Sequence, residues 1–504
     1  MEDPIWVSLM VWTTWILIAI IIDGLLIPIK LYLSRKSILK LDKNPVNLDL
    51  LPKMSVVIPA HNEEANIQQC IMSLLQCDYP NHKLELIVVD DGSTDDTVNI
   101  VKRCQVDAIL YGKDLKIISK SHSGKVHSLN TGIKQTQGEI IVTIDADIKV
   151  ASDALIKIAR PFIEDSSVGA ATGYIEIEWD NTKKDDFIKM FFSKSEFLEY
   201  LTSFNFERSY QSFVYSIYTM SGAFSAFRRD IIGNIGGYWP VTVSEDMHVT
   251  MMLHKKKVRI VNVPDAIAYA DAITDYDTLY SQRVRWSRGQ LEVAAMRKEE
   301  PRLNQETLKD ILGIVKDQKD PKLLELAFSY IKTKFTNYIK TLKNKTFRYY
   351  DLMGLPRILF IDHTIAFPRI IWVFILMMFP VLGLYTAILP IVALLMYLFY
   401  VFIDAVVILF AYYHSNPSTR EKIEESFHYV LLLPIYRLVI FCFRLSAFLH
   451  ILNEPAGWRV EGPINGFKNG VKDARTDIST SVTTAIFHIG NIFNQLNLIK
   501  RRGK

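Results

Sequence analysis

The sequence predicts an α/β domain with a largely parallel sheet, joined to a set of helices that cross a membrane. Short apolar runs alternate with helical stretches over residues 53–150, long apolar runs lie toward both ends, and 49% of the 504 residues are hydrophobic. The net charge of +4 is small for this length and gives no reason to expect a nucleic-acid partner. The four cysteines lack C-x-x-C spacing, which argues against a cysteine-based zinc site or a disulfide framework.

The first long apolar run, residues 7–29, predicts a membrane anchor. At about 1.5 Å per residue it is long enough to cross a hydrocarbon core of about 30 Å. Basic residues follow it and, by the positive-inside rule, place the next segment in the cytoplasm: Lys30, Arg35, Lys36 and Lys40. A cleaved signal peptide is the alternative, but the run has no basic segment before it and no small-residue cleavage site after it.

Four apolar runs predict the strands of the α/β domain: KMSVVIPA, LELIVVDD, LKIISK and EIIVTIDAD. The intervening segments, such as 63–77 and 94–105, have apolar residues spaced three and four apart, as helices do. Helices between successive strands imply parallel pairing, and ligands bind outside the carboxyl ends of such strands. Two acidic pairs lie at those ends, Asp90 with Asp91 and Asp145 with Asp147. One pair could be turn residues or helix caps, but two on one edge favour a binding site.

The remaining segments predict helices of several kinds. Residues 185–220 are aromatic and amphipathic, which fits a helix in the core or at the membrane interface. Apolar runs at 366–388 and 389–413 predict a transmembrane hairpin, and a third run near 427–452 contains two arginines. A charge at the bilayer centre costs about 2.5–3.5 kcal/mol on insertion scales, so those arginines must snorkel, pair or line a cavity.

The expected domains follow from these segments. They are an anchor with its basic flank at 1–40, a cytoplasmic α/β domain at 50–299, a lysine-rich helical insertion at 300–360, transmembrane helices at 361–453, and an amphipathic segment at 454–504. In the last of these, apolar residues share one face of a helix, which predicts an interfacial or bundle-packed position.

The pair Asp145 and Asp147 in TIDADIKV is suited to hold one divalent ion against a diphosphate. Hard cations prefer oxygen ligands, and Mg²⁺ is commonly shared between one or two carboxylates and phosphate oxygens. A lone D-x-D is weak evidence, because three-residue matches arise by chance in most chains. Its significance therefore depends on the motifs around it.

Six motifs occur in order: VVIPAHNEEANI, VVDDGSTDDT, GEIIVTIDAD, SGAFSAFRRDIIGNIGGY, SEDMHVTMML and QRVRW. Together the first three resemble family 2 glycosyltransferases with the GT-A fold. The last three resemble the processive membrane synthases of cellulose, hyaluronan, chitin and poly-N-acetylglucosamine. The resemblance covers roughly residues 53–295 and implies a GT-A (Rossmann-like) α/β cytoplasmic domain with an all-α transmembrane bundle. The insertion at 300–355 departs from the compact spacing expected after the last motif.

The resemblance implies a processive inverting transferase that extends a polysaccharide from a UDP-sugar and exports it. Mg²⁺ or Mn²⁺ would be held by Asp145 and Asp147. The implied partners are the UDP-sugar, the growing polysaccharide and the lipid bilayer, while an accessory export subunit or an oligomer is left open. The implied location is the plasma membrane, with several spans and a cytoplasmic catalytic domain.

Residues that match the motifs take the family's roles by the same resemblance. The uracil and ribose would be cradled by Asp90, Asp91 and the segment from Pro59 to Glu63, which includes Asn62. The diphosphate or donor sugar would be reached by Lys125 and Asn130. Ser221, in the fourth motif, is a further expected substrate contact.

Asp246 in SED would be the general base, with Glu245 beside it. An inverting transfer needs a base on the face opposite the leaving group, and a buried carboxylate can serve. The two adjacent carboxylates repel one another, so we expect one raised pKa. A solvated helix start is the simpler explanation of the pair taken alone.

The stretch SQRVRWSRGQ contains the Q-x-x-R-W signature, formed by Gln282, Arg285 and Trp286. Arg285 would neutralise the UDP leaving group through fork-like hydrogen bonds, and Trp286 would stack against the acceptor sugar. Arg283 and Arg288 are expected to be headgroup or helix-surface charges. The alternative for the whole stretch is a membrane-surface anchor.

Two other functions share parts of this pattern. A non-processive transferase that moves one sugar to a polyprenyl or other lipid acceptor has the donor motifs but needs no Q-x-x-R-W. A non-catalytic membrane scaffold would have no need to hold the acidic residues close together. The presence of QRVRW together with SED favours the processive synthase.

Overall fold

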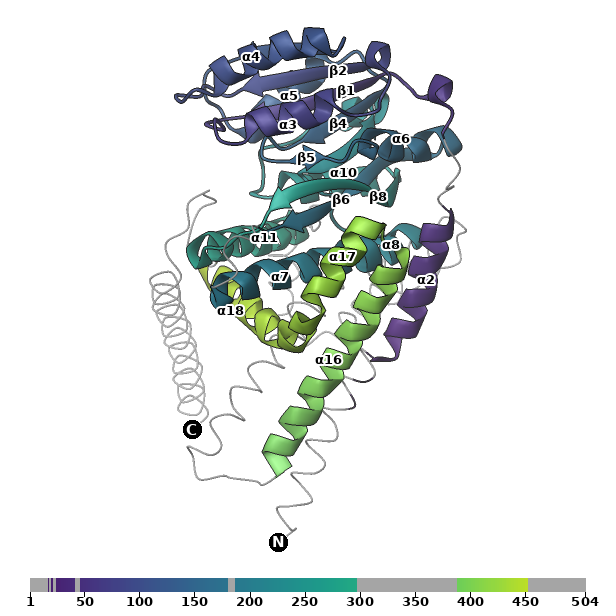
Figure 1. Cartoon of the computed structure of the whole chain (residues 1–504), viewed down its shortest axis with the longest axis vertical. Helices are drawn as coiled ribbons and strands as arrows, with labels where there is room; N and C mark the ends of the chain where they lie inside the picture. Colours follow the sequence, from purple (N-terminus) through teal and green to yellow (C-terminus); the bar gives the residue numbers. More distant parts are fainter. Residues whose placement is uncertain are drawn as a thin grey trace, which may run out of the picture.

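The computed structural model describes residues 17, 20, 24–40, 46–179, 186–296 and 388–451. An eight-stranded mixed sheet with its covering helices lies above a layer of helices, from which α16 extends downward (Figure 1). Most of the anchor at 7–29 lies outside the described residues. The insertion at 300–360, the run at 366–388 except its last residue, and the segment at 454–504 lie outside them as well.

The four predicted strands form one half of the sheet, in the order β3-β2-β1-β4 and all parallel, as predicted. Their bounds are Met54–Ala60 for β1, Leu84–Asp90 for β2, Asp114–Ser119 for β3 and Ile140–Ile144 for β4. The intervening helices are α3 (Ile67–Leu75), α4 (Thr97–Leu110) and α5 (Lys125–Gln135).

Strands β1, β2 and β4 are buried throughout, because helices cover both faces of the sheet. Alternate residues of a strand point to opposite faces, so Val56 and Ile58 pack with α3 and α4 whereas Val57 packs with α5. The interpretation of these continuous apolar runs as buried parallel strands is therefore confirmed.

The other half of the sheet continues from β4 through β7, β6 and β8 to β5, and β7 pairs antiparallel with both β4 and β6. The sequence analysis did not predict these strands. The bounds are Lys149–Val150 for β5, Val168–Glu178 for β6, Phe224–Arg228 for β7 and Arg259–Asp271 for β8. They contain Gly, Ala, Pro and charged residues, which lower the intrinsic strand signal.

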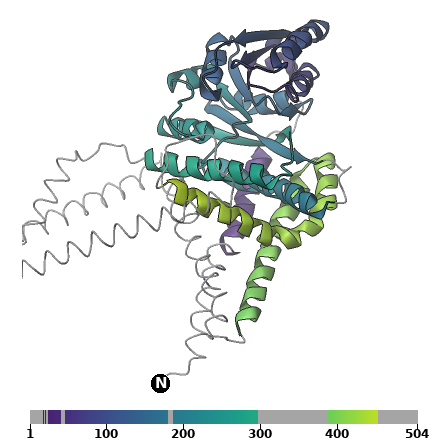
Figure 2. The same ribbon diagram turned by 90° about the vertical axis from the view of Figure 1, so that its left-hand side faces the viewer.

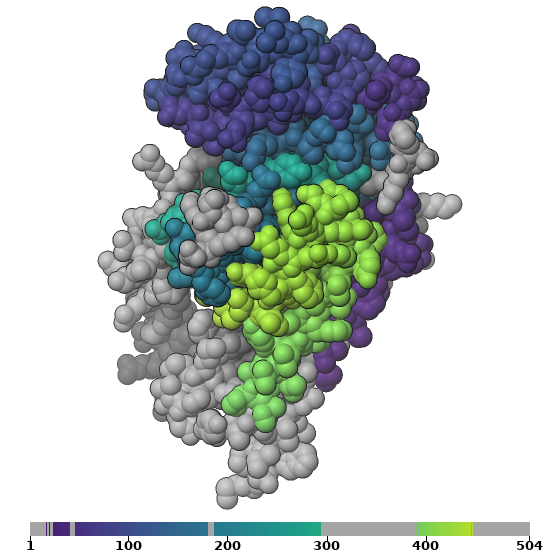
Figure 3. Space-filling model, in the orientation of Figure 1, coloured from purple at the N-terminus to yellow at the C-terminus, as the bar shows by residue number. Residues whose placement is uncertain are grey.

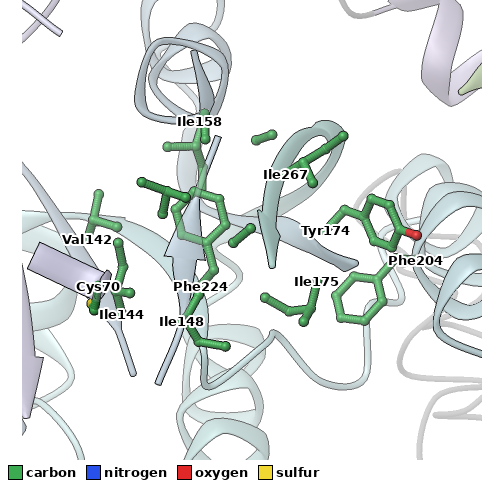
Figure 4. Packing of buried hydrophobic residues seen from close by; sticks show 14 of the residues in the cluster. Cys70, Val142, Ile144, Ile148, Ile158, Tyr174, Ile175, Phe204, Phe224 and Ile267 are labelled. Carbon is green, nitrogen blue, oxygen red and sulfur yellow. The ribbon is translucent and has the colours of Figure 1, made fainter. Parts of the chain in front are cut away.

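Packing rather than propensity fixes this second half. Figure 4 shows Phe224 of β7 among Ile148, Ile158 and Val142, and the ring of Tyr174 facing Phe204. A Cβ at position 173 would lie 2.3 Å from the Phe224 ring, so only glycine allows β6 and β7 to approach this closely. Helix α6 (Ala154–Glu164) covers this cluster, whereas α9 (Arg229–Asn234) and α10 (Glu245–Lys255) lie on the other face.

Beneath the sheet lie α7 (Phe187–Leu201), a π-helical segment (Thr202–Glu207), α8 (Arg208–Phe213) and α11 (Tyr276–Met296). Residues 185–220 were expected to lie either in the core or at a membrane interface. Eight residues of α7 are buried, including Lys194 and Glu196, so most of this helix belongs to the interior. Asn262 of β8 donates to the Phe204 carbonyl over 2.7 Å and ties the π-helical segment to the sheet.

The long apolar helix α16 (Ile388–His414) corresponds to the predicted run at 389–413, and α2 (Leu26–Lys40) packs near its upper end. The third run does not form one straight helix. It comprises α17 (Pro417–Ser426), a 3-10 segment (Phe427–Leu432) and α18 (Leu433–Ile451). Figure 2 shows α18 lying along α11, where the Tyr280 and Ser446 hydroxyls are 2.6 Å apart.

Within the described residues, two segments are long and apolar enough to cross a membrane, Ala393–His414 and Pro417–Arg444. The first has a mean hydropathy of 2.5 and the second 1.7. The arginines of the third run were expected to snorkel, to pair or to line a cavity. Arg437 pairs, because its guanidinium lies 2.7 Å from the Asp404 carboxylate of α16. In Figure 3 the carboxy-terminal helices cover one side of the molecule below the sheet.

Candidate active site

The predicted acidic pairs lie at one edge of the sheet, where β1, β2 and β4 end. Asp90 is the last residue of β2 and is in register with Ala60 of β1, and Asp91 follows it. Asp145 follows β4, and its backbone N–H donates to the Ala223 carbonyl over 3.3 Å. The topology therefore brings together three motifs that are separate in the sequence.

Lys125 connects the donor-side motif to the predicted base. Its Nζ lies 2.7 Å from Asp145 Oδ1 and 3.1 Å from Glu245 Oε1. Burial acts to lower the pKa of Lys125, but the two carboxylates outweigh it and raise that pKa. Lys125 is therefore a fixed positive charge between D-A-D and SED.

The carboxylates of D-A-D have raised pKa values. Burial and the nearby Asp147 raise the pKa of Asp145 to about 6, although Lys125 opposes the shift. Asp147 is more exposed than Asp145, yet desolvation by the surrounding protein and repulsion from Glu63 raise its pKa as well. Glu63 itself has a pKa raised by burial, with a smaller contribution from Asp145. These three carboxyl groups interact electrostatically, and Lys125, which pairs with Asp145, also pairs with Glu245, so negative charge is left uncompensated. Oxygen donors of this kind fit Mg²⁺ or Mn²⁺.

The pKa of Asp91 is lowered, so its carboxylate is ionised at neutral pH. Burial acts to raise its pKa, but Lys120 and the backbone N–H groups of Gly124 and Ser123 lower it to about 2. The two N–H groups donate over 2.7 Å and 3.0 Å. Asp91 thus fixes the loop between β3 and α5, which leads directly to Lys125.

The side chains of Asp90 and Asn62 shape the neighbouring loops. Asp90 Oδ1 accepts from the Ser93 N–H over 3.1 Å, and Asn62 Oδ1 accepts from the Thr94 N–H over 2.8 Å. Asn62 has a φ of 56°, in the left-handed region that asparagine tolerates better than most residues. The Glu63 N–H donates to Thr97 Oγ1, so the β1 and β2 loops are held to one another.

Three other predicted contact residues have structural partners. Asn130 exchanges hydrogen bonds of 2.7 Å and 2.9 Å with the carbonyl and N–H of Tyr238, and so clamps the turn after α9. Pro59 is buried within β1, in register with Val89. Ser221 is buried, and its N–H donates to Thr172 Oγ1 over 2.9 Å.

Glu245 and Asp246 occupy the first turn of α10, and their pKa values shift in opposite directions, with one raised as their adjacency predicted. Burial and repulsion from Glu245 raise the pKa of Asp246 to about 6, although the Met247 N–H opposes the shift. Burial also acts on Glu245, but Lys125 outweighs it and lowers that pKa. Two carboxylates whose surroundings push their pKa values apart are typical of an acid–base pair.

Gln282, Arg285 and Trp286 lie on α11, which packs against the start of α10. Arg285 is half-buried and close enough to Glu245 to lower its pKa. Gln282 Oε1 is buried and has no hydrogen-bond partner among the described residues. The fold therefore brings Q-x-x-R-W beside SED.

The expectation for Arg283 and Arg288 is wrong, because both are buried, with exposures of 5% and 7%. Arg283 lies 2.8 Å from Glu199 Oε2 and 3.5 Å from Glu196 Oε1, and its guanidinium is 4.5 Å from the Trp286 ring centroid. Arg288 pairs with Glu292 one turn later, over 2.9 Å.

Sequence reasoning missed the partners of Arg283. Glu196 and Glu199 lie one turn apart within the apolar, aromatic stretch of α7, and burial raises the pKa of Glu196 to about 7 although Arg283 opposes it. Buried acidic residues require a cationic partner. Two glutamates in an apolar, aromatic helix could therefore have indicated, from the sequence alone, that a buried arginine or lysine lies nearby.

The fold is an α/β domain with a mixed, GT-A-like sheet. Residues 55–236 match the model of glycosyl transferase family 2, and the chain carries a family 2 glycosyltransferase domain, as the motifs predicted.

Two curated relatives are named poly-beta-1,6-N-acetyl-D-glucosamine synthase. That of Staphylococcus aureus (strain COL) is 28% identical over 264 residues, which are 52% of this chain and 60% of the relative. That of Staphylococcus epidermidis is 29% identical over 260 residues, 50% of this chain and 60% of the relative. The chain thus spans about three-fifths of the length of these relatives.

Two solved structures resemble the chain more distantly. The mannosyltransferase PcManGT from Pyrobaculum calidifontis, in complex with GDP-Man and Mn²⁺, is 19% identical with a TM-score of 0.45 and covers 70% of this chain and 99% of its own. S. aureus TarS 1–349 in complex with UDP-GlcNAc is 22% identical with a TM-score of 0.33, covering 47% and 66%.

Proposed function

We propose that this protein is a processive inverting glycosyltransferase that extends a polysaccharide from a UDP-sugar and exports it across the membrane. The observation that carries the proposal is the link through Lys125, which lies within 3.1 Å of both Asp145 on the donor side and Glu245 beside the predicted base. Such a link would couple the charge at the donor to proton acceptance at the acceptor within one half-buried cluster.

The residues of the chain would act in three places. Asp90, Asp91 and the segment from Pro59 to Glu63 would hold the uridine, at the strand edge where their loops are fixed. The acceptor hydroxyl would attack the anomeric carbon as the bond to UDP breaks, and Asp246 would take the hydroxyl proton. Its pKa of about 6 leaves it largely ionised, and still basic, at neutral pH.

Leaving-group charge would be offset by cationic side chains. Lys125 is held at the D-A-D carboxylates, and Arg285 lies near Glu245 on the acceptor side. Asp145 and Asp147 would hold Mg²⁺ or Mn²⁺, which neutralises diphosphate charge when bound. The crowded carboxylates described above support that assignment.

Trp286 would be the acceptor platform. Its ring is held from one side by the Arg283 guanidinium and packs 6.3 Å from the Tyr200 ring, so its orientation is fixed before any sugar binds. A fixed aromatic face suits the C–H side of a pyranose and costs little ordering on binding. The names of the relatives make UDP-N-acetylglucosamine the first donor to test.

The proposed location is the plasma membrane, with several spans and the catalytic domain in the cytoplasm. Support comes from the two candidate spans and from the exposed apolar face of α16. The domain boundaries at 1–40, 50–299, 300–360, 361–453 and 454–504 remain part of this proposal. Export would require a path through or beside these helices.

The test is a donor-turnover assay on the detergent-purified chain with UDP-N-acetylglucosamine and Mn²⁺, in which UDP release and product length are both measured. Trp286→Ala should shorten the product at a similar rate of UDP release, and Trp286→Phe, which retains a ring, should restore much of the length. Stacking of a nucleic-acid base on an aromatic side chain is worth about 1–3 kcal/mol, and we take this as the scale for a sugar on Trp286. Single-sugar products from the parent protein would favour a lipid-acceptor transferase. If no UDP-sugar released UDP, the proposed transferase activity would be refuted.

A further inference from the structure

A second cluster of ligand atoms lies at the same sheet edge, formed by His61, Asp91 and His122 and called here the His–Asp–His cluster. One ligand atom from each residue lies within 4.8 Å of the other two, an arrangement suited to a metal ion. The three residues follow β1, β2 and β3, which are neighbours and parallel. Their carboxyl ends therefore meet, although the residues are 30 and 31 positions apart.

Both imidazoles face Asp91 through the same ring nitrogen. His122 Nδ1 lies 2.9 Å from Asp91 Oδ2, and His61 Nδ1 lies 3.0 Å from the Asp91 carbonyl oxygen. The ring centroids are 4.3 Å apart with the planes tilted by 32°. Both histidines are exposed, so an ion from solvent can reach them and the rings can turn toward it.

Asp91 is prepared as an anionic ligand. Its Oδ1 accepts from Lys120 and from the Ser123 N–H, and its Oδ2 accepts from the Gly124 N–H. Such outer hydrogen bonds orient a ligating carboxylate, and they keep it ionised across the whole physiological pH range. The positive charge of Lys120 repels a metal ion bound nearby. We therefore expect the cluster to bind a metal ion less tightly than a structural zinc site does.

We propose that the His–Asp–His cluster binds a borderline divalent transition-metal ion, with Zn²⁺ as its representative, through one nitrogen of each imidazole and the Asp91 carboxylate. Two nitrogen ligands select Zn²⁺ over Mg²⁺, whose ligands are oxygen atoms. Zinc–nitrogen bonds of about 2.0–2.1 Å place tetrahedral ligand atoms about 3.3 Å apart. The ligand atoms of the cluster lie within 4.8 Å of one another, and His122 Nδ1 lies 2.9 Å from Asp91 Oδ2, so turning the exposed rings would adjust them to this spacing. Water would take the fourth position.

Zinc at this place would exclude the nucleotide, because both would use Asp91. This consequence rests on the proposed function, whereas metal binding by the cluster does not. The chain would then be inhibited by Zn²⁺ at its donor pocket while it uses Mg²⁺ or Mn²⁺ at D-A-D.

Zinc binding is tested first, by titrating the detergent-purified full chain with Zn²⁺ against a chromogenic chelator. His61→Ala and His122→Ala should each weaken Zn²⁺ binding by more than about tenfold, and His122→Gln should do the same without removing side-chain volume. His127→Ala, which replaces an exposed histidine of α5 outside the cluster, should bind Zn²⁺ like the parent. Parental affinity in the His61 and His122 variants, or an equal loss in the His127 variant, would overturn the proposal.

Competition is tested by measuring UDP affinity with and without Zn²⁺ in each protein, so that every variant serves as its own reference. Zinc should weaken UDP binding to the parent and have no effect on His122→Ala at the same concentration. Zinc binding without any UDP binding would refute the proposed function alone. UDP binding that Zn²⁺ leaves unchanged in the parent, with no Zn²⁺ bound, would refute the inference alone.

Discussion

Neighbouring charges set the protonation of each carboxylate at this site. Asp91 is buried and Asp246 is half-buried, and the pKa of the first is about 2 whereas that of the second is about 6. Lys120 and two backbone N–H groups stabilise the Asp91 anion, whereas Asp246 has Glu245 beside it. The same residue type is therefore a fixed anion in one place and suited to proton transfer in the other.

The pH dependence of transfer should report Asp246. A base acts only when ionised, so with donor and metal saturating, the transfer rate should fall as pH decreases through about 6. Asp145 has a similar pKa, but a bound cation would hold it ionised under those conditions.

Asp246→Asn is the matched control for that profile. It should be nearly inactive at every pH and show no acidic limb, while its UDP affinity stays within about twofold of the parent. A retained limb together with substantial turnover in this variant would assign the base to another residue.

Arg283 should contribute strongly to stability, because it compensates the buried Glu196 and the half-buried Glu199. Removing one partner of a buried ion pair costs about 3–5 kcal/mol, so Arg283→Ala should lower the melting temperature of the purified chain by several degrees. Arg103→Ala breaks an exposed pair with Asp96, which solvent screens, and should melt like the parent. Equal melting temperatures for the two variants would contradict the structural role of Arg283.

At the scale of elements, the site depends on how α11 is seated against α10. Gly289 of α11 faces Ser244, the residue before α10, and a Cβ at position 289 would lie 2.0 Å from Ser244 Oγ and 2.4 Å from Ser244 Cβ. A serine side chain can turn its hydroxyl away, but its Cβ cannot move without the backbone. Glycine at 289 therefore sets the distance between Q-x-x-R-W and SED.

Gly289→Ala should push these helices apart, with a cost of about 1–3 kcal/mol from overpacking and a larger loss of transfer than of UDP binding. Gly233→Ala in α9 is the control, since a Cβ there meets nothing within 4 Å. That substitution should be neutral or slightly stabilising, because alanine favours helix more than glycine. Normal transfer by Gly289→Ala would show that α11 is not held at this contact.

At the scale of the whole molecule, ion pairs join the sheet to the helices below it. Lys422 of α17 lies 2.6 Å from the buried Glu176 of β6, and Lys194 of α7 lies 2.8 Å from Glu425. Lys30, from the basic flank that was expected to orient the anchor, lies 3.2 Å from Glu207. Within the described residues, the α/β domain and the apolar helices are thus bound together through charged contacts over their common surface.

The exposed apolar face of α16 should contact lipid. It contains Ile391, Leu394, Leu395, Leu398 and Phe402, whereas Asp404, Ile408 and Ala411 are buried. Leu398→Lys should reduce the alkali-resistant membrane fraction, since lysine near a span centre costs about 2.5–3.5 kcal/mol on insertion scales. Leu398→Ala should remain in the membrane like the parent, and equal extraction of both variants would place this face away from lipid.

The sequence by itself determined the parallel half of the sheet, the two acidic pairs at its edge and the family of the domain. These features are encoded locally, in continuous apolar strands, in the residues that directly follow them and in motifs a few residues long. Only the tertiary structure decided the mixed half of the sheet, the burial of Arg283, which of Glu245 and Asp246 has the raised pKa, and the His–Asp–His cluster. Each of these depends on groups that are tens of residues apart or more in the chain, and burial and Coulomb interactions act between them only after the fold has placed them side by side.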